Sequence, residues 1–154
     1  MVDAGAELVY PAGPGTCVSA ASSPGYRQLT GPCAAFVEEC YEHDMRAGPD
    51  GLVGAAVVNR ALGLGVFQRY ERSALPRHIT WRQLGTRAYV VAMEPSTNRD
   101  AGRFDARERG ELIHLAPGEE RRYRLEIGAL TGPDAIDAFA RQNTALAAEV
   151  QTPA

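Results

Sequence analysis

Lysine is absent from this sequence, and all 16 basic residues are arginine. We attribute this bias to genomic composition, although arginine also suits bidentate contacts to sugars and carboxylates. Positive charge is in the minority as well, because 19 acidic residues leave a net charge of −3 and a pI near 5.6. This balance argues against nucleic acid or an anionic membrane as a partner.

Long apolar runs are also missing. No stretch approaches the length of a membrane span, and Met1 is followed by Val2 and Asp3 rather than by a basic and then an apolar segment. The sequence therefore predicts a cytoplasmic protein without a signal peptide.

Cysteine and histidine are scarce, with three residues of each kind. These are Cys17, Cys33, Cys40, His43, His78 and His114. The odd number of cysteines and their irregular spacing predict free thiols in a reducing compartment. The histidines are too dispersed in the sequence to indicate a metal-ligand set. A glycine-rich phosphate loop is absent too. We expect neither a metal nor a cofactor.

Hydrophobic periodicity predicts a mainly β fold. Alternating or apolar segments bounded by turn residues indicate strands at 34–44, 52–59, 64–72, 79–84, 89–94, 111–115 and 120–130. Residues 52–59 and 64–72 form a hairpin in this prediction. Several short strands with close turn signals are typical of an antiparallel β-sandwich.

The two ends of the chain differ from this central pattern. Residues 1–32 are rich in Gly, Pro, Ala and Ser and predict loops with one short strand near 17–20. A C-terminal α-helix is expected to begin near Thr131 or Asp134, with Ile136, Phe139, Ala140, Leu146 and Val150 near helical spacing. We therefore divide the chain into a loop-rich segment (1–32), a β-sandwich half-domain (33–131) and a C-terminal helix and tail (132–154).

Glu94 is the strongest candidate for chemistry. It closes the expected strand 89–94 on the same face as two apolar residues, and Pro95 restricts it to extended geometry. Apolar neighbours would raise the pKa of its carboxyl, which a general base near neutral pH requires. The alternative interpretation is a strand-end glutamate paired with one of the arginines that follow.

Residues 90–130, VVAMEPSTNRDAGRFDARERGELIHLAPGEERRYRLEIGAL, resemble the C-terminal part of aldose 1-epimerase-like proteins of the galactose mutarotase superfamily, in its DUF4432 subgroup. The matching motifs are a Glu-Pro after an apolar strand and a Leu-x-Pro-Gly-Glu turn. Further matches are the strand end at 39–44, the Asp50-Gly51 turn and Leu75-Pro76 followed by Trp81, so the resemblance spans roughly residues 30 to 132.

The resemblance implies part of a galactose mutarotase-like supersandwich that acts on a small-molecule sugar. Glu94 stands where mutarotases carry the base that takes the anomeric hydroxyl proton, and His43 and Asp44 lie where they bind sugar. Pro95-Ser96 replaces the family's Thr-Gln, so the glutamine contact is not carried over. The family's His-x-Asn-x-Gly-x-Pro strand and its general acid are missing, which implies the C-terminal half of a sugar epimerase-like protein.

Three further residues are candidates for sugar binding. Trp81, the only tryptophan, could stack on the apolar face of a pyranose, and core packing is the alternative. Arg103 and Arg109 are the arginines after Glu94 that we select for a sugar acid or phosphate, with a solvated role as the alternative. The cluster around His43 and Asp44 could equally be a strand-end group of charges.

These observations lead to two functional hypotheses, and the missing upstream strand leaves a truncated, nonfunctional reading frame as a third possibility. The first is a carbohydrate-binding, aldose 1-epimerase-like isomerase with Glu94 as base. The second is a non-catalytic sugar-binding or assembly module whose exposed sheet edges pair with another chain. The polypeptide partners that this leaves open are a second copy of the chain and a missing N-terminal half.

Overall fold

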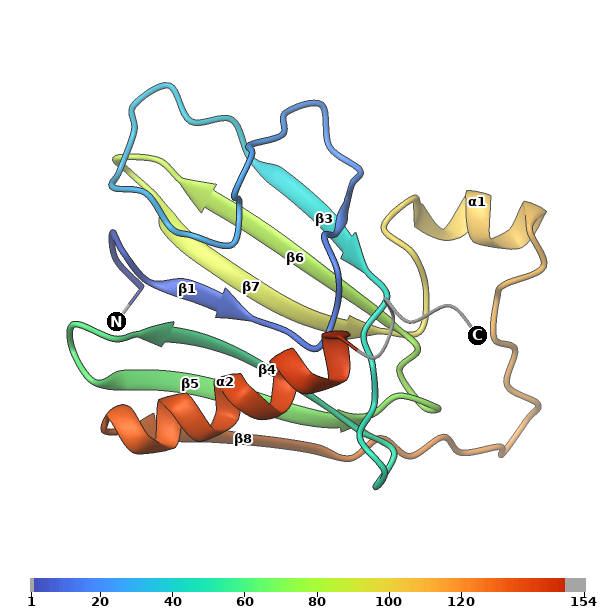
Figure 1. Ribbon diagram of the computed structural model, residues 1–154. Coiled ribbons are helices and arrows are strands. Elements are labelled where there is room, and N and C mark those ends of the chain that lie inside the picture. Colours follow the sequence, from blue (N-terminus) through green and yellow to red (C-terminus); the bar gives the residue numbers. More distant parts are fainter. Residues whose placement is uncertain (1, 149–154) are drawn as a thin grey trace.

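The computed structural model describes residues 2–148, which form two antiparallel four-stranded sheets stacked face to face (Figure 1). In the first, here called the β4 sheet, the order is β1 (Glu7–Val9), β4 (Leu52–Asn59), β5 (Leu64–Glu71) and β8 (Leu125–Thr131). In the second, the β6 sheet, the order is β2 (Thr16–Cys17), β3 (Glu39–His43), β6 (Arg77–Leu84) and β7 (Tyr89–Ser96). The predicted antiparallel sandwich is confirmed.

The hairpin of β4 and β5 forms as the sequence predicts. Asn59 pairs with Leu64, and the turn between them places Gly63 at a φ of 61°. A positive φ is readily adopted by glycine because it has no Cβ, so the glycine sets where the chain reverses. The hairpin forms the centre of the β4 sheet.

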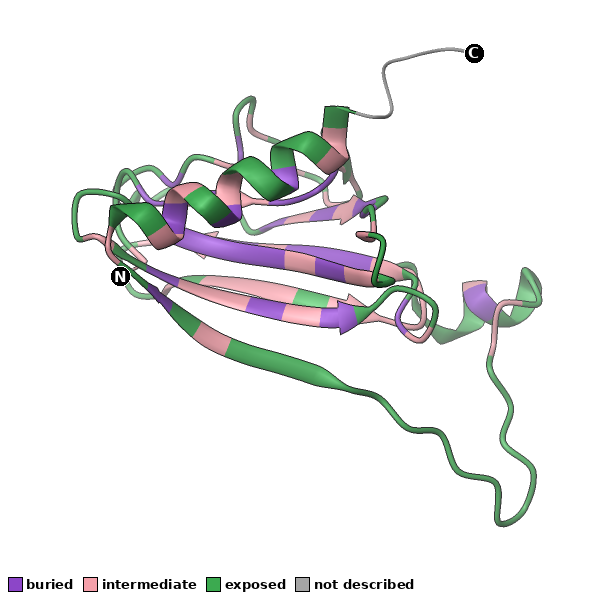
Figure 2. Cartoon of the chain, turned by 60° about the horizontal axis from the view of Figure 1, so that its bottom comes forward, coloured by how far each residue is buried: buried purple, intermediate pink, exposed green. Residues whose placement is uncertain are grey.

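The hydrophobic core lies between the sheets and is extended by the helix α2 (Pro133–Ala148). Val53, Ala55 and Val57 of β4 face the β6 sheet and are buried. On the other face of the β4 sheet, Ile136 and Phe139 of α2 pack on Ala56, Val58 and Leu130 (Figure 2). The predicted C-terminal helix is therefore present. Val150, which the helix pattern included, lies outside the described residues.

The expected strands at 111–115 and 120–124 are wrong. Residues 111–124 have no regular secondary structure, and β8 begins only at Leu125. The pairing of β8 with β5 begins at Leu125, which lies opposite Tyr70 near the end of β5. Alternation alone does not make a strand where no neighbouring strand supplies hydrogen bonds.

Other elements and boundaries also differ from the expectation, and β3 begins only at Glu39 rather than at residue 34. β7 continues past Glu94 to Ser96, because an edge strand tolerates a proline that lacks an N–H. The arginine-rich loop contains the short helix α1 (Gly102–Glu108). Near the N-terminus, β1 adds a strand at 7–9 that pairs with β4, and the short strand near 17–20 is found as β2 at 16–17. Within residues 2–148, neither helix is long and apolar enough to cross a bilayer.

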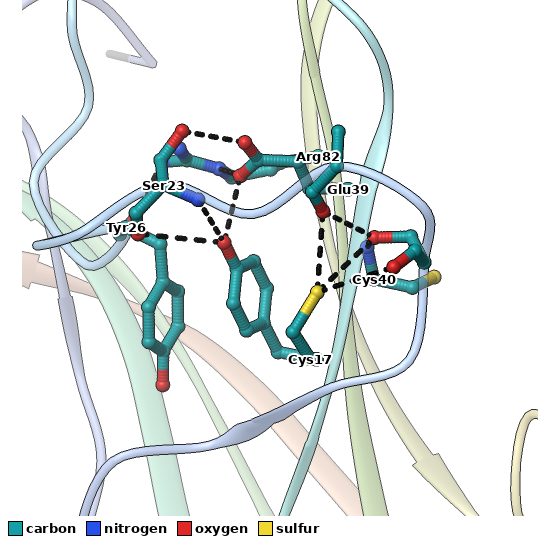
Figure 3. Close-up of polar contacts among 9 residues, drawn as sticks. Cys17, Ser23, Tyr26, Glu39, Cys40 and Arg82 are labelled. Atoms are coloured by element: carbon teal, nitrogen blue, oxygen red, sulfur yellow. Dashed lines mark hydrogen bonds and ion pairs between the residues drawn. The ribbon is translucent and has the colours of Figure 1, made fainter.

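A buried ion pair joins β3 to β6 inside the sandwich. Arg82 Nε lies 2.7 Å from Glu39 Oε2, and the two side chains are 2% and 4% exposed. Glu39 also accepts hydrogen bonds from Ser23 and from the Tyr41 hydroxyl, and Arg82 donates to the Tyr26 carbonyl (Figure 3). Burial alone would raise the pKa of Glu39, but the hydrogen bonds from Ser23, Arg82 and Tyr41 outweigh it and lower that pKa.

We expect Arg82→Met to destabilise the protein by about 3–5 kcal/mol, because it leaves the Glu39 carboxylate buried without its cation. Urea unfolding followed by circular dichroism measures the loss. The control is the double variant Glu39→Leu/Arg82→Met, which removes both charges and should recover much of the lost stability. Equal losses in the single and double variants would contradict this assignment.

Candidate functional site

Glu94 lies on the outward face of the β6 sheet, which is the face turned away from the β4 sheet. It sits opposite Ile79 in edge strand β7, and its side chain is exposed. Among residues 2–148 it makes no hydrogen bond and no ion pair, so none of the nearby arginines neutralises it. Partial burial raises the pKa of Glu94, and the negative charge of Asp100 raises it further.

Trp81 shares this face with Glu94. Its strand partner is Ala92, so it is the diagonal neighbour of Glu94 across the β6–β7 pair. The indole Nε1 donates to Glu38 Oε2 at 3.1 Å, and the ring is half-buried rather than enclosed between the sheets. A carboxylate and an aromatic ring therefore lie side by side on the outward surface of the sheet.

Glu42 of β3 lies on the same outward face, on the side of Ile79 away from Glu94. It lies in the same row as Ile79 and Glu94, and it binds the segment that follows β7. Arg99 Nη1 lies 3.1 Å from Glu42 Oε2, and the backbone N–H of Asp100 donates to Glu42 Oε1 at 2.8 Å. These contacts fold residues 97–100 back over the sheet and bring the Asp100 carboxylate near Glu94.

Cys40 lies in the next row of the outward face, opposite Trp81. Burial raises the pKa of its thiol to about 12, with further contributions from Asp100 and Glu94. The thiol therefore stays protonated near neutral pH, which makes it a poor nucleophile. The negative charge on this face is carried by the carboxylates, not by a thiolate.

His43 and Asp44 do not share the face of Glu94. His43 points between the sheets, where its Nε2 lies 3.2 Å from Thr80 Oγ1 and its Nδ1 lies 3.3 Å from the Tyr26 hydroxyl. Asp44 lies just beyond β3 and pairs with Arg72 at 2.8 Å. Both line a cleft at this end of the β6 sheet, which Glu42 and Arg99 also reach.

Arg103 and Arg109 lie in and just after α1, and both are exposed. The Arg103 guanidinium lies over the Phe104 ring, and Arg109 pairs with Asp105 at 2.7 Å. Neither arginine forms an ion pair with Glu94 among the described residues. Arg99 does reach the outward face, where it pairs with Glu42, and sequence reasoning did not select it.

The structure also places the three histidines. His78, like His43, faces the interior, and its Nδ1 lies 3.0 Å from the Tyr70 hydroxyl. His114 lies in the exposed part of segment 111–124. The strands that surround Glu94 therefore present no histidine on its face. Within the described part of the chain, no three His, Cys, Asp or Glu side chains gather to hold a metal ion.

Comparisons with known proteins agree with the fold. The family model described as Domain of unknown function (DUF4432) matches residues 1–129. A crystal structure described as a putative aldose 1-epimerase from Klebsiella pneumoniae subsp. pneumoniae MGH 78578 matches with a TM-score of 0.81 and 21% sequence identity. The match covers 94% of this chain and 39% of that chain, so this chain spans about two fifths of the relative's length. No curated protein matches the sequence.

The buried histidines make stability depend on pH. Burial lowers the pKa of His43 to about 3, and the positive charge of Arg27 contributes. Burial also lowers the pKa of His78 to about 3, with contributions from His43 and Arg27. Both are depressed below the unfolded value near 6.5, so the unfolded chain binds more protons as the pH falls from 6.5 towards 3. Stability present above pH 6.5 is lost over that range.

We expect the free energy of unfolding to fall by about 2 kcal/mol per histidine between pH 7 and pH 5. Urea unfolding at several pH values measures the slope. His78→Gln should be less stable at pH 7 but should show a shallower pH dependence, whereas His114→Gln, on the exposed segment, should leave the slope unchanged. A slope that is identical in all three proteins would contradict the burial of these groups as neutral imidazoles.

Proposed function

We propose, since this chain belongs to the family Domain of unknown function (DUF4432), that it binds a sugar on the outward face of the β6 sheet and promotes its anomerisation or a related epimerisation. The observation that carries the proposal is the Glu94 carboxylate, which is free of ion pairs among the described residues and has a raised pKa beside Trp81. The fold of the Klebsiella protein, described as a putative aldose 1-epimerase, supports it.

Glu94 acts as the general base in this proposal. Its carboxylate takes the proton from the anomeric hydroxyl, the C1–O1 bond becomes a carbonyl, and the bond from C1 to the ring oxygen breaks. The ring oxygen takes up a proton from water. On closure to the other face of the carbonyl the ring oxygen gives that proton back to water, and Glu94 returns its own proton to O1. Atoms and protons balance over the cycle, and no cofactor is consumed.

Trp81 positions the sugar for this step. The apolar C–H face of a pyranose packs on an aromatic ring, and the half-buried indole lies diagonally opposite Glu94. The indole N–H is already held by Glu38, which fixes the ring orientation. A pyranose stacked on this ring has its hydroxyls within the region bounded by Glu94 and Glu42.

The acid that protonates the ring oxygen is not provided by the buried histidines. His43 and His78 face the interior, on the opposite side of the sheet from Glu94. General acid–base catalysis has an acid and a base contribution, each typically about 10²–10⁴-fold in rate. Without a positioned acid, only the contribution of the base remains. We therefore expect slow anomerisation by this chain alone, with water as the proton donor.

A non-catalytic sugar-binding module is the second candidate function. The same face would bind a sugar without converting it. Trp81 would be the stacking platform, and Glu42 and Glu94 would accept hydrogen bonds from the sugar hydroxyls. The absence of a histidine on this face, among the described residues, favours this alternative over efficient catalysis. The two functions separate in an experiment that measures binding and exchange on the same sample.

We expect Glu94→Gln to lower the anomerisation rate by about 10²-fold while sugar binding is retained. NMR saturation exchange on a panel of aldoses gives the rate, and the fluorescence of Trp81, the only tryptophan, reports binding. Glu108→Gln, an exposed position in α1, is the matched control. Equal exchange in the wild type and Glu94→Gln would rule out the base. Binding without exchange in either would leave the sugar-binding module.

Asp100 is a positioning residue that raises the pKa of Glu94. Its negative charge disfavours the ionised form of Glu94, so Asp100→Asn should lower the pKa of Glu94 and move the acid limb of the pH–rate profile to lower pH. The Asp100 backbone contact to Glu42 is unaffected by this change. A carboxyl titration of Glu94 by NMR measures the shift even without turnover. Asp134→Asn, exposed on α2, should not shift it, and an unchanged titration in Asp100→Asn would refute the coupling.

A further inference from the structure

Strand β8 is the least protected sheet edge in residues 2–148. Each sheet has two edge strands, and three of these four edges are covered, short or interrupted by a proline, which limits their pairing with another strand. β1 is covered by residues 27–29, through hydrogen bonds such as Leu8 N to Arg27 O at 2.8 Å. β2 has only two residues, and β7 carries Pro95. β8 has seven residues and no proline, and such an edge is a template for pairing with another strand.

Apolar side chains on β8 face inward but are not covered. Leu125 and Ile127 lie opposite Tyr70 and Gln68 of β5, which are 1% and 6% exposed. Leu125 and Ile127 themselves are 46% and 71% exposed. The cause is the position of β7, whose Met93 carbonyl accepts from Gln68 Nε2 at 3.1 Å, so that the β6 sheet ends opposite β5. β8 extends beyond it, and Figure 2 shows this strand almost entirely exposed.

The sequence around β8 is self-complementary in one antiparallel register. When Leu125 is placed opposite Leu125 of a second chain, Tyr123 lies opposite Ile127 and Arg124 lies opposite Glu126, each twice. Tyr123, Leu125 and Ile127 then form one apolar row on the inward face, and opposite charges pair on the other face. Aromatic–β-branched pairs and opposite-charge pairs are among the cross-strand pairs that stabilise sheets.

We propose that β8 pairs with β8 of a second copy of this chain about a two-fold axis at Leu125. The pairing joins the two β4 sheets into one continuous sheet and covers the exposed row at 123, 125 and 127. It also accounts for the alternation at 120–124, which has no partner strand within one chain because pairing with β5 begins only at Leu125. In the dimer the second chain supplies those hydrogen bonds.

The two-fold symmetry makes the interface isologous, so each charge pair occurs twice and the assembly closes at two copies. Its area is limited to one strand edge and the row beside it, which is typical of reversible association rather than of an obligate dimer. Among residues 2–148 of one chain, the one ion pair of Glu126 is a 4.0 Å contact with Arg69, and both side chains are exposed. Glu126 is therefore available for Arg124 of the second copy.

Charge variants test both the partner and the register. Sedimentation equilibrium should show the wild type as a concentration-dependent dimer. Glu126→Arg and Arg124→Glu should each be monomeric, because each places like charges opposite one another twice. An equimolar mixture of the two variants should form a heterodimer, since both cross-strand pairs then join an arginine of one variant to a glutamate of the other. Glu108→Arg, which makes the same charge change on α1, should dimerise like the wild type.

The outcomes decide the proposal. A wild type that stays monomeric at the highest concentration that remains in solution overturns it, and leaves the edge for a strand from another polypeptide. A wild-type dimer with no rescue in the mixture overturns this register and edge. Folded monomers of both single variants, checked by circular dichroism, together with the rescued heterodimer support it. None of these readouts depends on sugar binding or on Glu94.

Discussion

The Glu39–Arg82 ion pair is the constraint on which the arrangement of the β6 sheet depends. A charged pair that is almost fully buried costs free energy to desolvate, and it is tolerated only because every partner is held in place. Glu39 is held through Ser23 and Tyr41, and Arg82 through the Tyr26 carbonyl. The loop-rich N-terminal segment is thereby tied to β3 and β6. Displacing that loop would leave the buried ion pair with an incomplete set of hydrogen bonds.

The two faces of the β6 sheet have different chemistry because side chains alternate along its strands. The inward face carries His43, His78, Thr80 and Arg82, which make a polar network with tyrosines from the loops and from β5. The outward face carries Glu42, Trp81 and Glu94 and is left uncovered by helix α2, which packs on the other sheet. The buried network and the candidate ligand-binding groups thus lie mainly on opposite faces of one sheet, and they meet at the cleft lined by His43, Glu42 and Arg99.

Much of the fold could be predicted from the sequence, since the β4–β5 hairpin, β3, β6 and α2 follow from periodicity and turn residues. The absence of a strand at 120–124 could not be predicted, because the existence of a strand depends on a neighbouring strand that periodicity does not reveal. At the candidate site, Glu94 and Trp81 share a face, as strand parity allows, whereas His43 has the opposite parity. Asp100 and Arg99 reach the site only through the return of a loop to Glu42, a tertiary contact that no local pattern encodes.

The order of strands has a consequence for how the chain is made. Strands 1, 4, 5 and 8 form one layer and strands 2, 3, 6 and 7 form the other, so the polypeptide crosses between layers four times. The β4 sheet lacks its last strand until residue 131 has emerged from the ribosome, and α2 follows immediately. Neither layer is a separable subdomain. We therefore picture both layers forming in one cooperative step after synthesis, dominated by pairings between residues distant in sequence, which is a slow class of folding reaction.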